Sequence, residues 1–331
     1  MSTPPKIVDA SVWRGADFAE SRAWVESFSK IMLAELDAAM KGFFATGKSA
    51  WQVTPAEFPL PSCVEVLDRV FAALDAGRGF AVLRGIPVDE YSYEENLILY
   101  CGIMSHLGRI VVQNYEGQSV VDVIDKGIEY SHQARGYSSN KLLPFHTDGA
   151  DFAGLFCLGQ AEQGGTSLIA SASLIYNVIS AEQPDILKTL MRGYYHHRRG
   201  QHPPDENPIS SERVPVFAFH NGLVHCCYNR NPMDWVEKEG QKLSDEEVAA
   251  LDFLDAVIAR PETQLSLLPH KGDIQLINNY LILHSRTGYR DGPDEKRHMV
   301  RVWLDNPAGV RNGYSLLDLY VPEESRYQAA K

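Results

Sequence analysis

The chain has 331 residues, 44% hydrophobic and 22% charged, a composition that is typical of a globular protein and excludes a disordered or fibrous one. Its formal net charge of −12 argues against nucleic-acid and anionic-membrane partners, because both kinds of binding depend on clustered Lys and Arg. No apolar run approaches the roughly 20 residues of a membrane-spanning helix, and the first residues do not resemble a secretory signal. The five cysteines show no paired spacing. We therefore expect a cytoplasmic protein with reduced thiols, and the composition leaves room for a homo-oligomer.

The first part of the chain predicts mainly helices. Apolar residues recur at helical spacing over 18–40, over 63–76 and over 91–107. An apolar run bounded by glycines over 79–85 predicts a short buried strand. We expect residues 1–78 to form a helical N-terminal region of a single domain that spans the whole chain.

From about residue 120 the pattern changes to many short strands separated by Gly, Pro, Asn and Asp. The predicted strands are 120–124, 155–158, 167–171, 214–219, 223–228, 263–267, 273–277 and 298–304. Such a series favours a sandwich or barrel over alternating βαβ units, so the fold class predicted here is mainly β with flanking helices.

Two helices and one long loop interrupt these strands. A helix is predicted over 173–191, bent or broken at Pro184, and another over 244–259, where a capping box marks its start. The polar segment over 195–213 contains several prolines and is expected to be a surface loop. A substrate lid is the alternative, since long loops in compact enzymes are often functional.

The sequence Phe-His-Thr-Asp places an imidazole, His146, and a carboxylate, Asp148, two residues apart. On an extended backbone both side chains leave the same face and can chelate one ion. Two histidines and one carboxylate suit iron(II) and leave positions open for other ligands. Because a short His-x-Asp motif recurs by chance, it needs support from elsewhere in the chain.

The candidate second histidine, His284, closes an apolar segment that begins near Asp273. It lies 284 − 148 = 136 residues beyond Asp148, so a strand sandwich must bring the two together. A buried, hydrogen-bonded structural histidine is the alternative.

Arg297 and Arg301 are four residues apart, on one face of a predicted alternating strand. We expect that strand to lie near the one that ends at His284, since consecutive strands are usually neighbours. An unpaired guanidinium in an apolar stretch is costly, so a bidentate carboxylate ligand would account for these arginines. Salt bridges to carboxylates of the protein itself are the alternative.

Four motifs occur in one order along the chain. They are His146-Thr147-Asp148, Gly164-Gly165-Thr166-Ser167, the Asn-Asn-x-x-x-x-His-x-Arg sequence that ends at Arg286, and the Arg-x-x-x-Arg-x-Trp-Leu sequence that begins at Arg297. Together they resemble the taurine dioxygenase (TauD/TfdA) family of 2-oxoglutarate-dependent oxygenases, which includes the γ-butyrobetaine hydroxylase and clavaminate synthase branches. The resemblance implies a double-stranded β-helix, or jelly-roll, core with insertions over 79–305, followed by a C-terminal tail over 306–331.

The resemblance also implies that His146, Asp148 and His284 hold Fe(II), with 2-oxoglutarate and O2 as co-substrates. The activity it implies is a dioxygenase that oxidises an unactivated C–H bond and releases succinate and CO2. The carboxylate at Asp148 favours hydroxylation, desaturation or ring closure, because halogenating relatives have a small residue there. A zinc-dependent hydrolase is one alternative, since the same ligands serve zinc. A catalytically silent metal- or ligand-binding jelly-roll protein is the other.

By the same resemblance, Arg297, thirteen residues after His284, would hold the C5 carboxylate of 2-oxoglutarate. A hydroxyl of the Gly-Gly-Thr-Ser turn would assist it, with Ser167 matching better than Thr166. Many members of the family have Gly-Gly-Asp-Thr at this turn, and the departure affects only the assignment of the helper hydroxyl. Arg301 matches a position that meets the anionic group of the substrate in relatives.

Further candidate contacts to the substrate are Arg198 in the long loop and Tyr228 after a predicted strand. Together with Arg301, the arginines of this region predict a small metabolite that carries a carboxylate or another anionic group.

Overall fold

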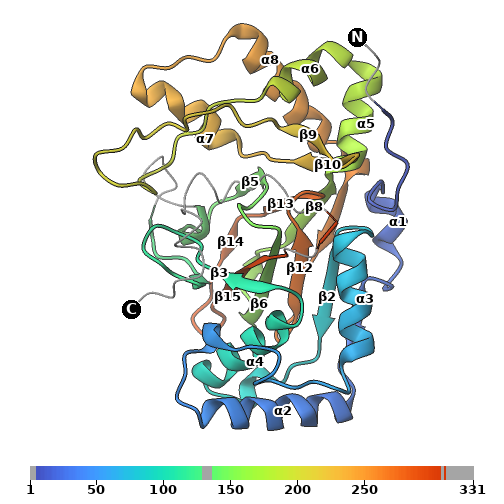
Figure 1. Cartoon of the computed structure of the whole chain (residues 1–331), viewed down its shortest axis with the longest axis vertical. Helices are drawn as coiled ribbons and strands as arrows, with labels where there is room; N and C mark the ends of the chain where they lie inside the picture. The colour runs from blue at the N-terminus through green and yellow to red at the C-terminus, as the bar shows by residue number, and fades with distance from the viewer. Residues whose placement is uncertain (1–4, 129–135, 307–308, 311–331) are drawn as a thin grey trace.

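The computed structural model describes residues 5–128, 136–306 and 309–310, and Figure 1 shows how its helices and strands are arranged. The tail predicted over 306–331 therefore lies almost entirely outside the described residues. No helix in the described part of the chain has both the length and the apolar character needed to cross a bilayer. All five cysteines are buried and free.

The N-terminal region is helical but is interrupted by a strand. Its elements are α1 (Gly15–Ala19), β1 (Val25–Ser27), α2 (Lys30–Phe44) and α3 (Val64–Asp75). The single helix predicted over 18–40 is wrong, because residues 25–27 pair in parallel with a neighbouring strand. Ser29 then starts α2 by accepting a hydrogen bond from the backbone N–H of Met32 at 3.3 Å. The helices predicted over 63–76 and 91–107 are confirmed as α3 and α4 (Tyr93–Ser105).

The larger sheet has seven strands in the order β1-β2-β12-β6-β15-β3, with β4 also paired to β15. Its other strands are β2 (Phe80–Arg84), β3 (Arg109–Val111), β4 (Val120–Val123), β6 (Phe152–Gly159), β12 (Ile274–Asn278) and β15 (His298–Asp305). Val300, Val302 and Leu304, which alternate along β15, pack with residues of α2, α3 and α4 in one buried cluster. The alternation turns Arg301 and Trp303 to the opposite face of the sheet.

The second sheet has four strands in the order β11-β8-β13-β5. They are β11 (Gln264–Leu267), β8 (Ser167–Ser171), β13 (Ile282–Arg286) and β5 (Leu143–His146). Ile169 and Leu265 of this sheet share a buried cluster with Ala153 and Ile277 of the larger sheet. The two sheets therefore pack face to face, and side chains that point inward from either sheet can meet.

Helices cover the outer face of the smaller sheet as well. α5 (Ala172–Glu182), α6 (Pro184–Arg192) and α8 (Asp245–Ile258) share a cluster with Ala170 and Leu283. The break predicted at Pro184 is confirmed, and so is the capping box of α8, in which Ser244 and Glu247 exchange hydrogen bonds.

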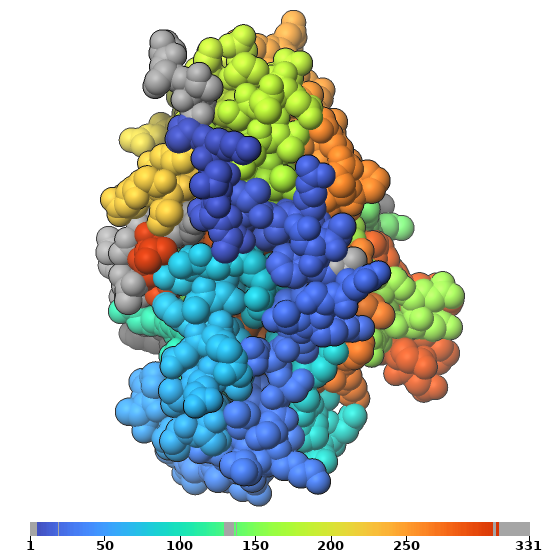
Figure 2. All heavy atoms as spheres, turned by 90° about the vertical axis from the view of Figure 1, so that its right-hand side faces the viewer, coloured from blue at the N-terminus to red at the C-terminus, as the bar shows by residue number. Residues whose placement is uncertain are grey.

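Three short elements complete the fold. α7 is Arg230–Asp234, the hairpin β9 (Phe217–His220) and β10 (Leu223–Cys226) lies by the upper helices, and β7 (Gln163–Gly164) pairs with β14 (Tyr289–Arg290). Figure 2 shows that segments from the first third of the chain cover much of the middle and lower parts of one side of the molecule. The result is a mixed α/β architecture with several sheets.

Most of the predicted strands are present, but their arrangement differs from the prediction in one respect. The strand with Arg301 is not a ladder partner of the strand with His284, because β15 belongs to the larger sheet and β13 to the smaller one. Between them, β14 pairs with β7 and carries the chain from one sheet to the other. The arginines and the histidine consequently face each other across the space between the sheets.

Candidate active site

His146 and His284 are brought together by the register of two adjacent strands. In the antiparallel pair β5–β13, His146 lies directly opposite His284. Opposed residues of such a pair place their side chains on one face with Cβ atoms about 4.5–5.5 Å apart. The two imidazole rings lie 4.2 Å apart between centroids. A separation of 138 residues in sequence thus becomes a direct contact, since 284 − 146 = 138.

Asp148 follows β5 and is held in place by its backbone. The Thr147 N–H donates to the Tyr228 carbonyl oxygen at 2.7 Å, and the Asp148 N–H donates to Asn279 Oδ1 at 3.0 Å. The amide nitrogen of Asn279 also donates to the Ala150 carbonyl oxygen at 2.8 Å. Asn279 therefore fixes the turn that presents the carboxylate.

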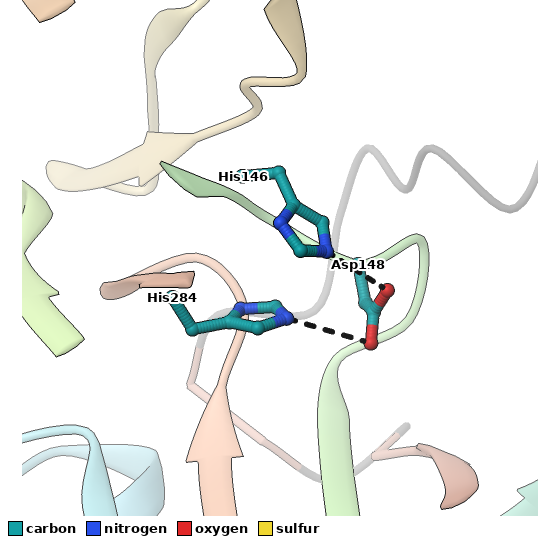
Figure 3. Close-up of side chains that lie close together, drawn as sticks. All are labelled: His146, Asp148 and His284. Carbon is teal, nitrogen blue, oxygen red and sulfur yellow. Dashed lines mark ion pairs between the residues drawn. The ribbon is translucent and has the colours of Figure 1, made fainter. Parts of the chain in front are cut away.

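The three side chains converge on one point (Figure 3). The Nε2 atom of His146 is 3.9 Å from one carboxylate oxygen of Asp148, and the Nε2 atom of His284 is 3.8 Å from the other. The three ligand atoms all lie within 4.8 Å of one another. This set of two nitrogen atoms and one oxygen atom has the composition of the 2-His-1-carboxylate iron(II) site.

Two further groups orient the Asp148 carboxylate. Arg301 Nη1 lies 3.1 Å from Oδ1, and the indole N–H of Trp303 donates to Oδ2 at 3.0 Å. Arg301 is itself held by Gln113, whose buried Oε1 accepts from Nε at 2.8 Å. The alternative considered for this arginine, a salt bridge to a carboxylate of the protein, is therefore present.

Burial and the neighbouring charges together favour the protonation states that bind a metal ion. Burial lowers the pKa of His284 to about 3, and the adjacent His146 adds to the effect. Burial also lowers the pKa of His146. Burial opposes ionisation of Asp148, but Arg301 and the two histidines outweigh it and lower the pKa of that carboxyl to about 2. At neutral pH the site thus offers two neutral imidazoles and one carboxylate, the forms that bind a metal ion.

A cavity beside the triad is lined by three arginines, Arg286, Arg297 and Arg301, together with Ser167. Arg297 is 5% exposed and donates from Nη1 to the Val123 carbonyl oxygen at 3.3 Å. Arg297 and Arg301 both line this cavity, although Arg297 precedes β15 and the register of β15 against β6 shifts between His298 and Met299. Thr166 does not line it, but lines a neighbouring hollow that has Arg297 as a common wall.

Two of the predicted substrate contacts are not brought to this cavity. Arg198 forms an ion pair with Glu206 of its own loop at 2.6 Å. The Tyr228 side chain is fully buried in the cluster under α8, where its hydroxyl donates to Asp255. Neither residue lines the cavity that contains the triad.

Sequence reasoning assigned no role to four residues that build the site. Asn279, Arg286 and Trp303 all stand inside the motifs quoted above, so the signal was present without an assignment. Gln113 has no such signal, because it comes from an unremarkable segment after β3.

The fold and the site together define a non-haem iron oxygenase. Residues 46–303 match the model of the taurine catabolism dioxygenase TauD, TfdA family, and the chain belongs to that family. The FR-33289 synthase of Streptomyces rubellomurinus is 33% identical over 315 residues, which cover 93% of this chain and 91% of that protein. The taurine hydroxylase-like protein SAT17 of Stachybotrys chartarum is 30% identical over 326 residues, which cover 92% of this chain and 82% of that protein.

A solved structure extends the likeness to the fold. It is an asparagine oxygenase in complex with Fe(II), hydroxyasparagine and succinate, with a TM-score of 0.63 and 16% identity over 85% of this chain and 93% of that one. The chain is accordingly a 2-oxoglutarate-dependent non-haem iron oxygenase with Fe(II) and 2-oxoglutarate as its cofactors. Membership of this family sets aside the zinc hydrolase and the silent binding protein as alternatives.

Proposed function

We propose that this protein hydroxylates an unactivated C–H bond of a small metabolite that carries a carboxylate or another anionic group, with release of succinate and CO2. The observation that carries the proposal is the cavity beside the triad, which three guanidinium groups, Arg286, Arg297 and Arg301, help to line. Buried cations require anions, and 2-oxoglutarate with an anionic substrate would supply them.

Each residue of the site has a role in this proposal. His146, Asp148 and His284 would hold Fe(II), which together with 2-oxoglutarate and O2 supplies the oxidising chemistry. Arg297 would hold the C5 carboxylate of 2-oxoglutarate, and the Ser167 hydroxyl on the same cavity wall would donate to it. Thr166 is the second candidate for that hydroxyl.

The substrate would bind on the side of the triad where Arg301 lies. Arg301 contacts Asp148, so a substrate anion that meets its guanidinium would sit next to the metal ligands. This placement orients the substrate, because a bidentate contact restricts both its position and its rotation. Arg198 and Tyr228 stay predicted contacts, which the cavity lining does not support.

The architecture in this proposal is a single oxygenase domain over 1–331 whose two facing sheets form the double-stranded β-helix. In its favour, the triad residues come from the smaller sheet and the turn after it. Arg301 belongs to the larger sheet, Arg297 directly precedes its strand β15, and the site lies between the two sheets. Hydroxylation is further supported by the hydroxyasparagine in the asparagine oxygenase complex.

The test is a screen for succinate released on addition of amino acids and other organic acids, with matched cationic compounds that lack a carboxylate. We expect stimulation by a subset of the anionic compounds and a product heavier by one oxygen atom in mass spectrometry. Stimulation by carboxylate-free cations alone would refute the substrate class. A product that has lost two hydrogens, without gain of oxygen, would refute hydroxylation.

A further inference from the structure

Arg286 occupies the cavity next to the metal centre. It follows His284 by two residues on β13, so both side chains leave the same face of the strand. Only 5% of the residue is exposed, and it lines the same cavity as Arg297 and Ser167. Arg286 is thus part of the binding space and not of the surface.

The hydrogen bonds of this guanidinium are incomplete. Its Nη2 donates to the carbonyl oxygens of Ser139, at 2.9 Å, and Lys141. Its Nε and Nη1 atoms are buried and have no hydrogen-bond partner. Within residues 5–128, 136–306 and 309–310, neither Arg286 nor Arg297 forms an ion pair with a carboxylate. Buried donors of a charged group are costly when left unsatisfied, so these atoms favour an anionic ligand.

Tyr289 joins the two arginines into one unit. The guanidinium carbon of Arg286 is 4.7 Å from the centre of the Tyr289 ring, and that of Arg297 is 5.2 Å from it. The ring stabilises both cations in part through its π-electrons. Two buried positive charges that line one cavity favour a carboxylate between them.

We propose that Arg286 is a second carboxylate-binding residue of the co-substrate subsite and that, with Arg297, it selects 2-oxo acids with a distal carboxylate. The inference rests on the proposed function and adds to it a specificity-determining residue. The distal carboxylate of 2-oxoglutarate accepts from both guanidinium groups, while the Nη2 contacts of Arg286 to Ser139 and Lys141 keep that side chain in place.

The experiment compares two ligands of equal chain length on the full-length protein loaded with Mn(II) under argon. They are 2-oxoglutarate and 2-oxopentanoate, which has a methyl group where 2-oxoglutarate has its distal carboxylate. Isothermal titration calorimetry gives both dissociation constants, and their ratio measures how strongly the site recognises that carboxylate. In the Arg286→Gln variant we expect the preference for 2-oxoglutarate to fall by about ten- to a hundredfold, as for the loss of charge-assisted hydrogen bonds.

Two further variants separate binding from folding. Arg286→Lys keeps the positive charge and should lose less of the preference, and it serves as the test if the Gln variant does not fold. Arg84→Gln breaks the ion pair with Asp273, 2.7 Å long and outside the cavity, and should leave the preference unchanged.

The outcomes are distinguishable. If Arg286→Gln and Arg286→Lys weaken both ligands by the same factor, the residue only supports the backbone at 139–141 and the inference is wrong. If the wild-type preference survives in both variants, the inference alone fails. If the wild-type protein binds both ligands equally well, the co-substrate part of the proposed function fails with it.

Discussion

Substitution of Trp303 by Phe tests whether the indole N–H positions the metal-binding carboxylate. The change removes the donor that lies 3.0 Å from Asp148 Oδ2 but keeps an aromatic ring in a residue that is only 4% exposed. A hydrogen bond to a charged group contributes about 1.5–3 kcal/mol, and 1.4 kcal/mol corresponds to a factor of ten. With Arg301 as its main remaining restraint, the carboxylate would rotate more freely in the metal-free protein. We therefore expect the dissociation constant for Fe(II) to rise about ten- to a hundredfold, the range seen when partners of metal ligands are removed.

The assay is an anaerobic Fe(II) titration in competition with a chromogenic chelator. Trp13→Phe is the matched control, because Trp13 is 3% exposed, belongs to the same buried cluster and donates its indole N–H to the Arg78 carbonyl oxygen at 2.9 Å. It should lower stability comparably and leave metal affinity unchanged. The reasoning is refuted if Trp303→Phe binds Fe(II) like the wild type, or if Trp13→Phe weakens binding equally.

Three further predictions follow from the site and the fold. His284→Ala should abolish the visible charge-transfer band of the anaerobic Fe(II)–2-oxoglutarate complex, whereas His270→Ala, outside the triad, should retain it; a band in both would contradict the ligand assignment. Gly272→Ala should destabilise the protein by several kcal/mol in urea unfolding, because φ is +86° and a Cβ would overlap a backbone carbonyl oxygen. Gly42→Ala, inside α2 with open space around it, should stabilise by about 0.5–1 kcal/mol, and an equal effect of the two substitutions would contradict this account. Burial raises the pKa of Asp151 from 3.8 to about 6, so the folded state binds this proton more tightly than the unfolded state. Its contribution to stability is therefore lost as the pH rises from about 4 through 6, by up to about 3 kcal/mol, and Asp151→Asn should flatten this part of the pH profile of unfolding.

Local sequence patterns predicted well those helices that have one apolar face or a clear capping motif. The stripe over 63–76 and the capping box at Ser244 correspond closely to α3 and α8. The helix predicted over 18–40 failed because residues 25–27 are extended by pairing with β2, a contact between distant segments that helical spacing does not report. The prediction that the strand with Arg301 neighbours the strand with His284 failed for the same reason. The crossing of the chain from β13 to β15 depends on the pairing of β14 with β7.

In the candidate site, too, some residues could be predicted from local sequence and others could not. His146 and His284 could be chosen from their motifs, but the groups that orient Asp148 could not be assigned from spacing. Trp303 comes from the other sheet, 155 residues away in sequence. Tyr228 was predicted to contact the substrate, yet its ring is in the core. Its backbone contacts Thr147, since its carbonyl oxygen accepts from the Thr147 N–H and its N–H donates to the Thr147 hydroxyl.

The position of β5 in its sheet has a consequence for the protein without iron. β5 is the outermost strand of the order β11-β8-β13-β5, and His146 lies at its last residue, opposite His284. A metal ion bound by both imidazoles is therefore a cross-link between an edge strand and its ladder partner β13. On its other side β5 has an isolated bridge between His146 and Asn229. The free energy of metal binding adds to the local stability of the pair β5–β13, because the opened strand offers no complete set of ligands. Loss of iron would thus loosen the border of the smaller sheet, and a protease that attacks opened strands would distinguish the two forms of the enzyme before any assay of turnover.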